Sequence, residues 1–229
     1  ALEIGAGNGY QSEILVKDYV SNLVSTDLNN NRLQKKENSR IKYEIIDAEC
    51  IGDRFNDNTF DLIFSSNLLE HLPNPEKCMN GVKKILKDDG IFIFSVPSRF
   101  WKILDFILYI PNRIRYIIIN KRITSKKSSF KTSVGNNIKS ESQRRSLLSK
   151  LILPEIHGVS SNNFSEFINW GQTRWINRVK SCDMVVIQVI KLPVYSPYLF
   201  GFFKARTIFE KLGFSSSYAY VVKKSSQLL

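Results

Sequence analysis

Leu2-Glu3-Ile4-Gly5-Ala6-Gly7-Asn8-Gly9-Tyr10 opens the chain and already implies its architecture. A short apolar run leads into three glycines at alternate positions, and helical spacing of apolar residues follows over 10–19. Glycine lacks a Cβ atom, so the backbone can turn sharply there and approach a ligand closely. The start of the next helix adds unpaired N–H groups and the positive end of its dipole. We expect this loop to bind a nucleoside that carries a charged tail.

Strand-like and helix-like segments then alternate along the chain. The patterns predict strands over 2–4, 22–26, 41–46, 60–65 and 91–96, and helices over 10–19, 29–36 and 75–86, the last ended by Asp89-Gly90. Beyond residue 160 they predict helices over 164–179 and 205–212 and strands over 184–192 and 217–223. Such alternation favours a Rossmann-like, doubly wound α/β fold, in which helices cover both faces of a parallel sheet.

Two acidic residues follow the second and third predicted strands. Asp27 comes 22 residues after Gly5, where a carboxylate can accept hydrogen bonds from both hydroxyls of a ribose. Asp47, followed by Ala48, can accept from an adenine amino group while a backbone N–H meets the ring. The alternatives are a helix-capping aspartate at 27 and a solvated loop acid at 47.

The glycine spacing separates two classes of nucleotide site. Dinucleotide folds use GxGxxG, whose third glycine would fall at Tyr10, whereas this chain has GxGxG ending at Gly9. A nicotinamide-dependent oxidoreductase is therefore disfavoured. The fourth predicted strand opens onto Ser66 and Asn67, on the side where ligands bind in such folds.

Residues 1–98 resemble the class I S-adenosylmethionine-dependent methyltransferases, specifically their type 11 branch. The family's first motif, E/D-x-G-x-G-x-G, is matched by Glu3, Gly5, Gly7 and Gly9, its ribose acid by Asp27 and its Asp-Ala pair by Asp47 and Ala48. A later motif is matched by Asp57, Phe60, Asp61, Glu70, His71 and Leu72. The resemblance weakens beyond residue 98, where only the closing antiparallel strand pair is similar.

The resemblance implies a mostly parallel sheet of seven strands with an antiparallel last strand. It also implies S-adenosylmethionine as cofactor, bound by Glu3, Gly5, Ala6, Gly7, Gly9, Asp27, Leu28, Asp47, Ala48, Ser66 and Asn67. No metal site is expected. The family's usual helix before the first strand is absent, and we expect an N-terminal part to precede Ala1.

His71 is the candidate general base, because imidazole titrates near neutral pH and this residue follows the fourth strand. A base is needed only where the acceptor loses a proton. The alternative is a capping or core histidine. His157 is a second histidine that could face the substrate, and Phe167, Trp170 and Trp175 have the spacing of a buried helix face.

Positive charge is concentrated in one part of the chain. The net charge is +12, and residues 99–150 carry 13 Lys and Arg against 2 Asp and Glu. Basic, aromatic segments over 100–120 and 193–203 are typical of a membrane interface or a lipid-facing channel. The alternatives are a substrate-domain core with a solvated basic arm over 121–150, and RNA contact, although no RNA-binding motif is present.

We divide the chain into a cofactor-binding core over 1–98, a basic aromatic insertion over 99–160, and a closing part over 161–229. The three cysteines, Cys50, Cys78 and Cys182, are far apart, so we expect reduced thiols and a cytoplasmic location, with contact to an anionic membrane surface through 100–150. The predicted function is methyl transfer to a small-molecule, glycan or lipid-linked acceptor. A non-catalytic nucleoside-binding module and an RNA methyltransferase are the alternatives, and the oligomeric state is not predicted.

Overall fold

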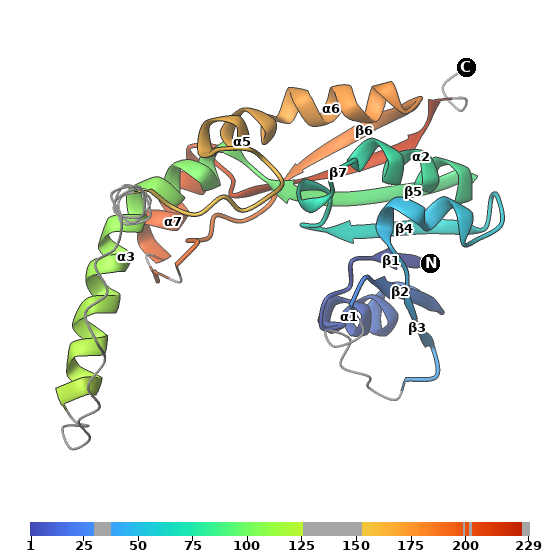
Figure 1. Ribbon diagram of the computed structural model, residues 1–229. Helices are drawn as coiled ribbons and strands as arrows, with labels where there is room; N and C mark the ends of the chain where they lie inside the picture. The colour runs from blue at the N-terminus through green and yellow to red at the C-terminus, as the bar shows by residue number, and fades with distance from the viewer. Residues whose placement is uncertain (30–37, 126–152, 199, 202, 226–229) are drawn as a thin grey trace, which may run out of the picture.

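The computed structural model describes residues 1–29, 38–125, 153–198, 200, 201 and 203–225. Seven strands form one sheet in the order β3-β2-β1-β4-β5-β7-β6 (Figure 1). The strands are β1 (Leu2–Ile4), β2 (Leu23–Asp27), β3 (Ile41–Ile45), β4 (Phe60–Ser66), β5 (Leu86–Pro97), β6 (Met184–Lys191) and β7 (Ser217–Lys224). The predicted seven-stranded α/β fold is confirmed.

The first five strands pair in parallel, and the last strand runs against its neighbours. β1 pairs in parallel with both β2 and β4, so it lies at the point where the strand order reverses. β7 inserts between β5 and β6 and is antiparallel to both. Ligands in open α/β sheets bind outside the carboxyl ends of the strands at such a reversal, which here is the end of β1 and β4.

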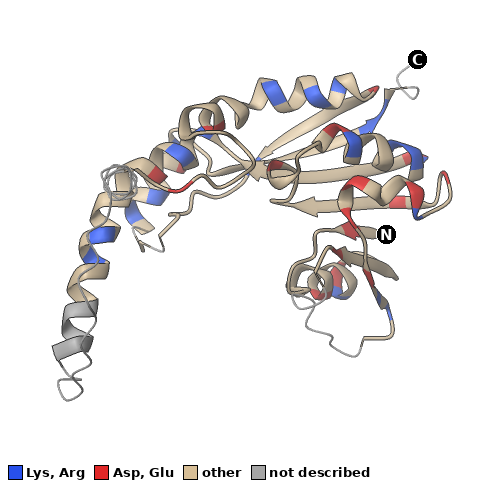
Figure 2. Cartoon of the chain, in the orientation of Figure 1, with Lys and Arg blue, Asp and Glu red and all other residues tan. Residues whose placement is uncertain are grey.

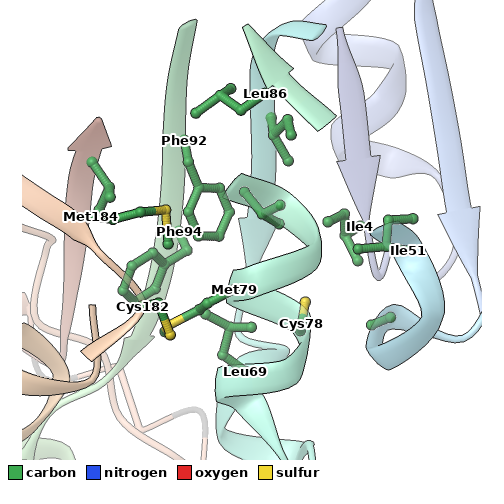
Figure 3. Close-up of a cluster of buried hydrophobic side chains, with 14 of the residues drawn as sticks. Ile4, Ile51, Leu69, Cys78, Met79, Leu86, Phe92, Phe94, Cys182 and Met184 are labelled. Carbon is green, nitrogen blue, oxygen red and sulfur yellow. The ribbon is translucent and has the colours of Figure 1, made fainter. Parts of the chain in front are cut away.

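One face of the sheet is covered by α2 (Pro75–Ile85) and α6 (Gln172–Ser181), together with the 3₁₀ helix η1 (Ala48–Asp53). Both α2 and α6 place apolar residues on one side, and these residues belong to the same core as Ile4, Phe92 and Phe94 of the strands. Figure 3 shows Met79 of α2 close to Phe94. Pro75 begins α2, and the Asn74 side chain accepts the N–H of Lys77 as its cap. This layer is the main core of the protein.

The other face is covered near β2 and β3 by α1 (Tyr10–Asp18). Val16 of α1 packs with Leu23 and Ile41, whereas Leu2 and Ile4 belong to the core on the opposite face. Side chains alternate between the faces of a strand, so each of these strands contributes to both layers. The sheet is therefore doubly wound where it approaches the glycine loop.

The long helix α3 (Arg99–Ser125) starts directly after β5 and projects away from the sheet (Figure 1). Its first turns pack against α5 (Asn163–Asn169), and α7 (Phe203–Lys211) lies beside its start. Within the residues that the structure describes, no helix is both long and apolar enough to cross a lipid bilayer.

Several predicted boundaries were wrong. The helix predicted over 164–179 is two helices, α5 and α6, because the chain is extended at Gly171, which caps α6. The helix predicted over 75–86 ends at Ile85, and the strand predicted from 91 begins at Leu86, because buried Leu86 already pairs with Phe60 in the sheet. The arm predicted over 121–150 is helical up to Ser125, and its remainder and the helix predicted over 29–36 fall largely outside the described residues.

Candidate active site

The glycine loop forms a tight turn at the carboxyl end of β1. Gly5, Gly7 and Gly9 have φ angles of 76°, 59° and 75°, the left-handed region that disfavours residues with a Cβ atom. The N–H groups of Gly5 and Ala6 both donate to the carbonyl of Thr26, at 2.8 and 2.9 Å. The loop is thereby held against the end of β2.

Asp27 lies beside this loop. One carboxylate oxygen accepts the N–H of Gly7 at 2.9 Å, and the other accepts the N–H of Asn29 at 3.0 Å. An ionised carboxylate has about four acceptor positions, so both oxygens retain capacity for ligand hydroxyls. The neighbouring Leu28 is 70% exposed.

Asp47 and Ala48 lie at the end of β3, next to the end of β2, because the N–H of Ile46 donates to the carbonyl of Asp27 at 3.1 Å. Asp47 caps η1 by accepting the N–H of Glu49 at 2.9 Å, while its side chain remains exposed. The two acids thus follow adjacent strands at one edge of the sheet.

The structure places Glu3 differently from the prediction of a direct cofactor contact. Its side chain is buried behind the loop, where the Ser12 hydroxyl of α1 donates to Oε2 and Ser25 of β2 lies 3.5 Å away. Burial is the main cause that raises the pKa of this carboxyl. Through these contacts Glu3 of β1 connects to α1 and β2, the elements on either side of the loop.

Ser66 and Asn67 follow β4 on the same edge. The Ser66 hydroxyl bonds to Ser95 at 3.1 Å and to the Gln11 amide at 3.3 Å, which ties β4 to β5 and α1. Asn67 is exposed and has a φ of 49°, so the chain turns sharply there. The side chain of Leu68 then covers Gly5, since a Cβ there would lie 2.8 Å from Leu68.

A buried carboxyl group lies just beyond Leu68. The Glu70 side chain is 1% exposed, and neither of its oxygens has a hydrogen-bond partner among the described residues. Burial raises the pKa of Glu70 to about 8. A buried, unsatisfied and strongly perturbed carboxyl group next to a ligand loop is typical of a functional site.

Successive contacts connect this carboxyl group to two histidines and two other aromatic residues. We call the five residues the Glu70 cluster: Glu70, His71, Trp101, His157 and Tyr195. His71 Nε2 lies 3.8 Å from Glu70 Oε1, and the rings of His71 and His157 lie 5.5 Å apart, between centroids. Trp101 packs against His157 at 5.1 Å and keeps an unpartnered, buried indole N–H. Glu70 also contributes to raising the pKa of Tyr195, after the larger effect of burial.

A buried ion network holds the His157 segment in place. Glu166 accepts the N–H groups of His157 and Gly158 at 2.6 and 2.8 Å, and its other oxygen pairs with Lys102 at 2.5 Å. Lys102 is fully buried and also pairs with Asp105 at 3.1 Å. The network connects α3 and α5 to the loop that carries His157.

Residues 2–94 match the family model described as a methyltransferase domain. This part of the chain is therefore a type 11 methyltransferase domain, which includes β1 to β4 and most of β5. The curated relatives include phosphoethanolamine N-methyltransferase 2 from Caenorhabditis elegans, 30% identical over 105 residues, which are 43% of this chain and 24% of that protein. Another is the mitochondrial arginine-hydroxylase NDUFAF5 from Danio rerio, 31% identical over 93 residues, which are 41% of this chain and 29% of that protein. The chain thus spans less than a third of either relative.

An S-adenosylmethionine-dependent methyltransferase from Mesorhizobium loti has the same fold. It superposes with a TM-score of 0.54 at 15% identity, over 97% of this chain and 89% of that one. The likeness extends past residue 94, so the methyltransferase fold includes α3 and the closing strands.

The cofactor of this methyltransferase family is S-adenosylmethionine, and the residues present fit it. A Cβ atom at Gly7 would meet nothing within 4 Å, so the loop leaves open space on its outer side. The glycine loop, Asp27 and the Asp47-Ala48 pair are the groups that would hold the cofactor. Bound there, it would supply a methyl group activated by a positively charged sulfur.

Sequence reasoning singled out His71 and His157 but did not group them with Glu70, Trp101 and Tyr195 in one site. The sequence shows Glu70 only as part of a motif, because its burial depends on packing that no local pattern shows. Lys102 and Asp105 carried a usable signal: two opposite charges three residues apart interrupt a mainly apolar stretch, and such charges are rarely buried unless paired.

Proposed function

We propose that this chain transfers a methyl group from S-adenosylmethionine to a small-molecule acceptor that carries an O–H or N–H group. One observation carries the proposal: the glycine loop of a methyltransferase domain has an open outer face at Gly7 and lies beside Asp27. Positioning and a suitable electrostatic setting are the main requirements for methyl transfer, since the leaving group is already good.

The Glu70 cluster is the proposed acceptor site. It follows β4 and lies next to the glycine loop through Leu68, so an acceptor bound there would be near a cofactor on the loop. The acid group of Glu70 and the indole N–H of Trp101 are unpartnered and buried, which makes them ready to bond a polar acceptor. His71 is the proposed base that takes the proton from the acceptor.

Cofactor binding is tested by thermal denaturation with S-adenosylmethionine and with its demethylated product. Both should raise the melting temperature of the wild-type chain. The variant Asp27→Ala should lose most of this shift, whereas Asp61→Ala, at an exposed acid far from the loop, should keep it. If neither compound shifts the wild-type chain, the proposed function is wrong.

Catalysis is tested by incubating the protein with methyl-labelled S-adenosylmethionine and fractionated cell extract. Labelled small molecules are expected from the wild-type chain and at least tenfold less from His71→Gln. A cofactor shift without any labelled product would instead favour the non-catalytic binding module. Label confined to RNA would favour the RNA methyltransferase.

The finer assignment, a lipid-linked or glycan acceptor met in the cytoplasm at an anionic membrane surface, belongs to the same proposal. Its support is α3, where Ile107, Ile114 and Ile118 are 62%, 54% and 49% exposed. Arg113 and Arg115 lie among them, and Figure 2 shows positive charge along the projecting helix. Exposed isoleucines next to arginines are typical of helices that lie in the membrane interface.

A further inference from the structure

An apolar pocket lies between the start of α3 and the segment that leads into α7. Its volume is about 410 Å³, within the range of small-molecule sites. Its lining is mostly aliphatic and aromatic and includes Leu104, Leu108, Tyr195, Phe200, Ala205 and Phe209. A pocket of this size and chemistry suits a hydrocarbon chain.

Arg206 is the only charged residue in the pocket lining, among the residues that the structure describes. Its positive charge is balanced by Glu210. Arg206 Nε pairs with Glu210 Oε1 at 2.9 Å, and the same oxygen accepts the N–H of Val194 at 2.8 Å. An anionic group would therefore have to compete with Glu210 for Arg206. The pocket favours an uncharged occupant.

Tyr195 lies between the pocket and the proposed acceptor site. Tyr195 lines the pocket, while its ring lies 6.5 Å from Trp101, between centroids. Its hydroxyl bonds to Ser217 at 3.0 Å, which fixes the ring between the two regions. A molecule with its polar end at the Glu70 cluster would therefore reach the pocket along the ring of Tyr195.

The pocket also continues onto the exposed side of α3. Ile107 lines the pocket and is itself 62% exposed, and Ile110 and Ile114 follow along the same helix at 44% and 54% exposure. Apolar surface therefore extends from the pocket along α3, with Arg113 and Arg115 beside it.

We infer that the α3–α7 pocket binds the hydrocarbon tail of an amphipathic acceptor whose polar end lies at the Glu70 cluster. The inference rests on the proposed function and narrows its acceptor class to molecules with an aliphatic or prenyl chain. Tail burial makes binding steeply dependent on chain length, by about fourfold for each buried methylene.

The test uses 11-(dansylamino)undecanoic acid at sub-micellar concentration, with dansylglycine as the probe that lacks the chain. The wild-type chain should enhance and blue-shift the fluorescence of the long-chain probe only. Ala205→Phe fills the pocket and should weaken binding at least tenfold, whereas Thr207→Phe, on the same helix but outside the pocket, should leave it unchanged. Leu108→Asn provides a second variant that makes the pocket polar.

The melting shift with S-adenosylmethionine is measured on each of these proteins. Loss of probe binding with an unchanged cofactor shift in Ala205→Phe supports the tail pocket. Failure of the wild-type chain to bind the long-chain probe, or undiminished binding by both Ala205→Phe and Leu108→Asn, overturns it. A missing cofactor shift in the wild-type chain would overturn the proposed function instead, whatever the probe shows.

Discussion

The ring of His157 lies 5.5 Å from the ring of His71, although one residue precedes α5 and the other follows β4. Two separate structural units meet at this pair. The methyltransferase domain supplies His71 at the carboxyl end of its sheet, and the segment after α3 supplies His157. The proposed acceptor site is therefore shared between the family's common core and the part of the chain outside the family match.

The Lys102–Glu166 pair should be critical for the placement of His157. Replacing Lys102 by Met leaves Glu166 and Asp105 buried without their cation, which we expect to cost about 3–5 kcal/mol of unfolding free energy. Lys211→Met, at an exposed lysine, should change stability by less than about 0.5 kcal/mol. Urea denaturation measures both.

The double variant Lys102→Met/Glu166→Gln separates charge from packing. The new amide oxygen would still accept the N–H groups of His157 and Gly158, but the side chain would carry no charge. The double variant should be more stable than Lys102→Met alone. Equal stability of the two would contradict the electrostatic explanation.

Glu70 should make the protein less stable as the pH rises. The folded state holds its proton up to about pH 8, whereas the unfolded chain releases it near the ordinary value of 4.5. Between these values the folded state binds more protons, so the unfolding free energy falls with increasing pH, by up to about 1.4 kcal/mol per unit from this group.

The variant Glu70→Gln should remove this dependence, because Gln does not titrate. Its unfolding free energy, measured from about pH 5 to about pH 9, should change less with pH than that of the wild-type chain. This range spans most of the interval between the two pKa values of Glu70. Asp53→Asn, at an exposed acid, should follow the wild-type profile. A parallel profile for Glu70→Gln would show that Glu70 is already ionised in the folded state.

The proposed cofactor site could be predicted from the sequence, because its residues directly follow predicted strands and can be found from short motifs. The order strand, glycines, helix places Gly5, Gly7 and Gly9 at the end of β1, and Asp27 lies beside them because β2 is the next parallel strand. The burial of Glu3 was not accessible, since the motif does not show which way a strand residue points. Its partners, Ser12 and Ser25, lie on the far side of the loop.

The proposed acceptor side was accessible only in part. The sequence indicated His71 and His157, but their grouping depends on packing between distant segments. Trp101, His157 and Tyr195 come from three segments that no periodicity connects, and only the folded chain brings them to Glu70. The sequence also did not show that the helix predicted over 164–179 is interrupted at Gly171. The apolar spacing of Trp170 and Trp175 continues across Gly171, although Trp170 caps α5 and Trp175 lies in α6.

Gly7 should be needed for cofactor binding but not for folding. In Gly7→Ala the new methyl group meets no atom of the protein, so the cost is the left-handed backbone alone, about 1–2 kcal/mol. The methyl group does fill the open side of the loop, so the melting shift with S-adenosylmethionine should disappear.

Gly213 provides the matched control, since it has a φ of 87° and lies after α7, away from the loop. Gly213→Ala should lose similar stability and keep the full cofactor shift. A normal shift in Gly7→Ala would mean that the cofactor does not approach this part of the loop.

The exposed isoleucines of α3 should govern binding to anionic vesicles. Sedimentation with phosphatidylglycerol-containing vesicles should recover the wild-type chain at low salt and less of it at high salt, because screening weakens the attraction of Arg113 and Arg115. Ile114→Asp/Ile118→Asp should reduce partitioning into the vesicles at least tenfold, since burying each isoleucine contributes about 1.5–3 kcal/mol.

The control is Ile187→Asp, on the edge strand β6 at 47% exposure, which should bind as the wild-type chain does. Equal loss in both variants would indicate a general effect of added negative charge, and α3 would then have no particular role at the membrane.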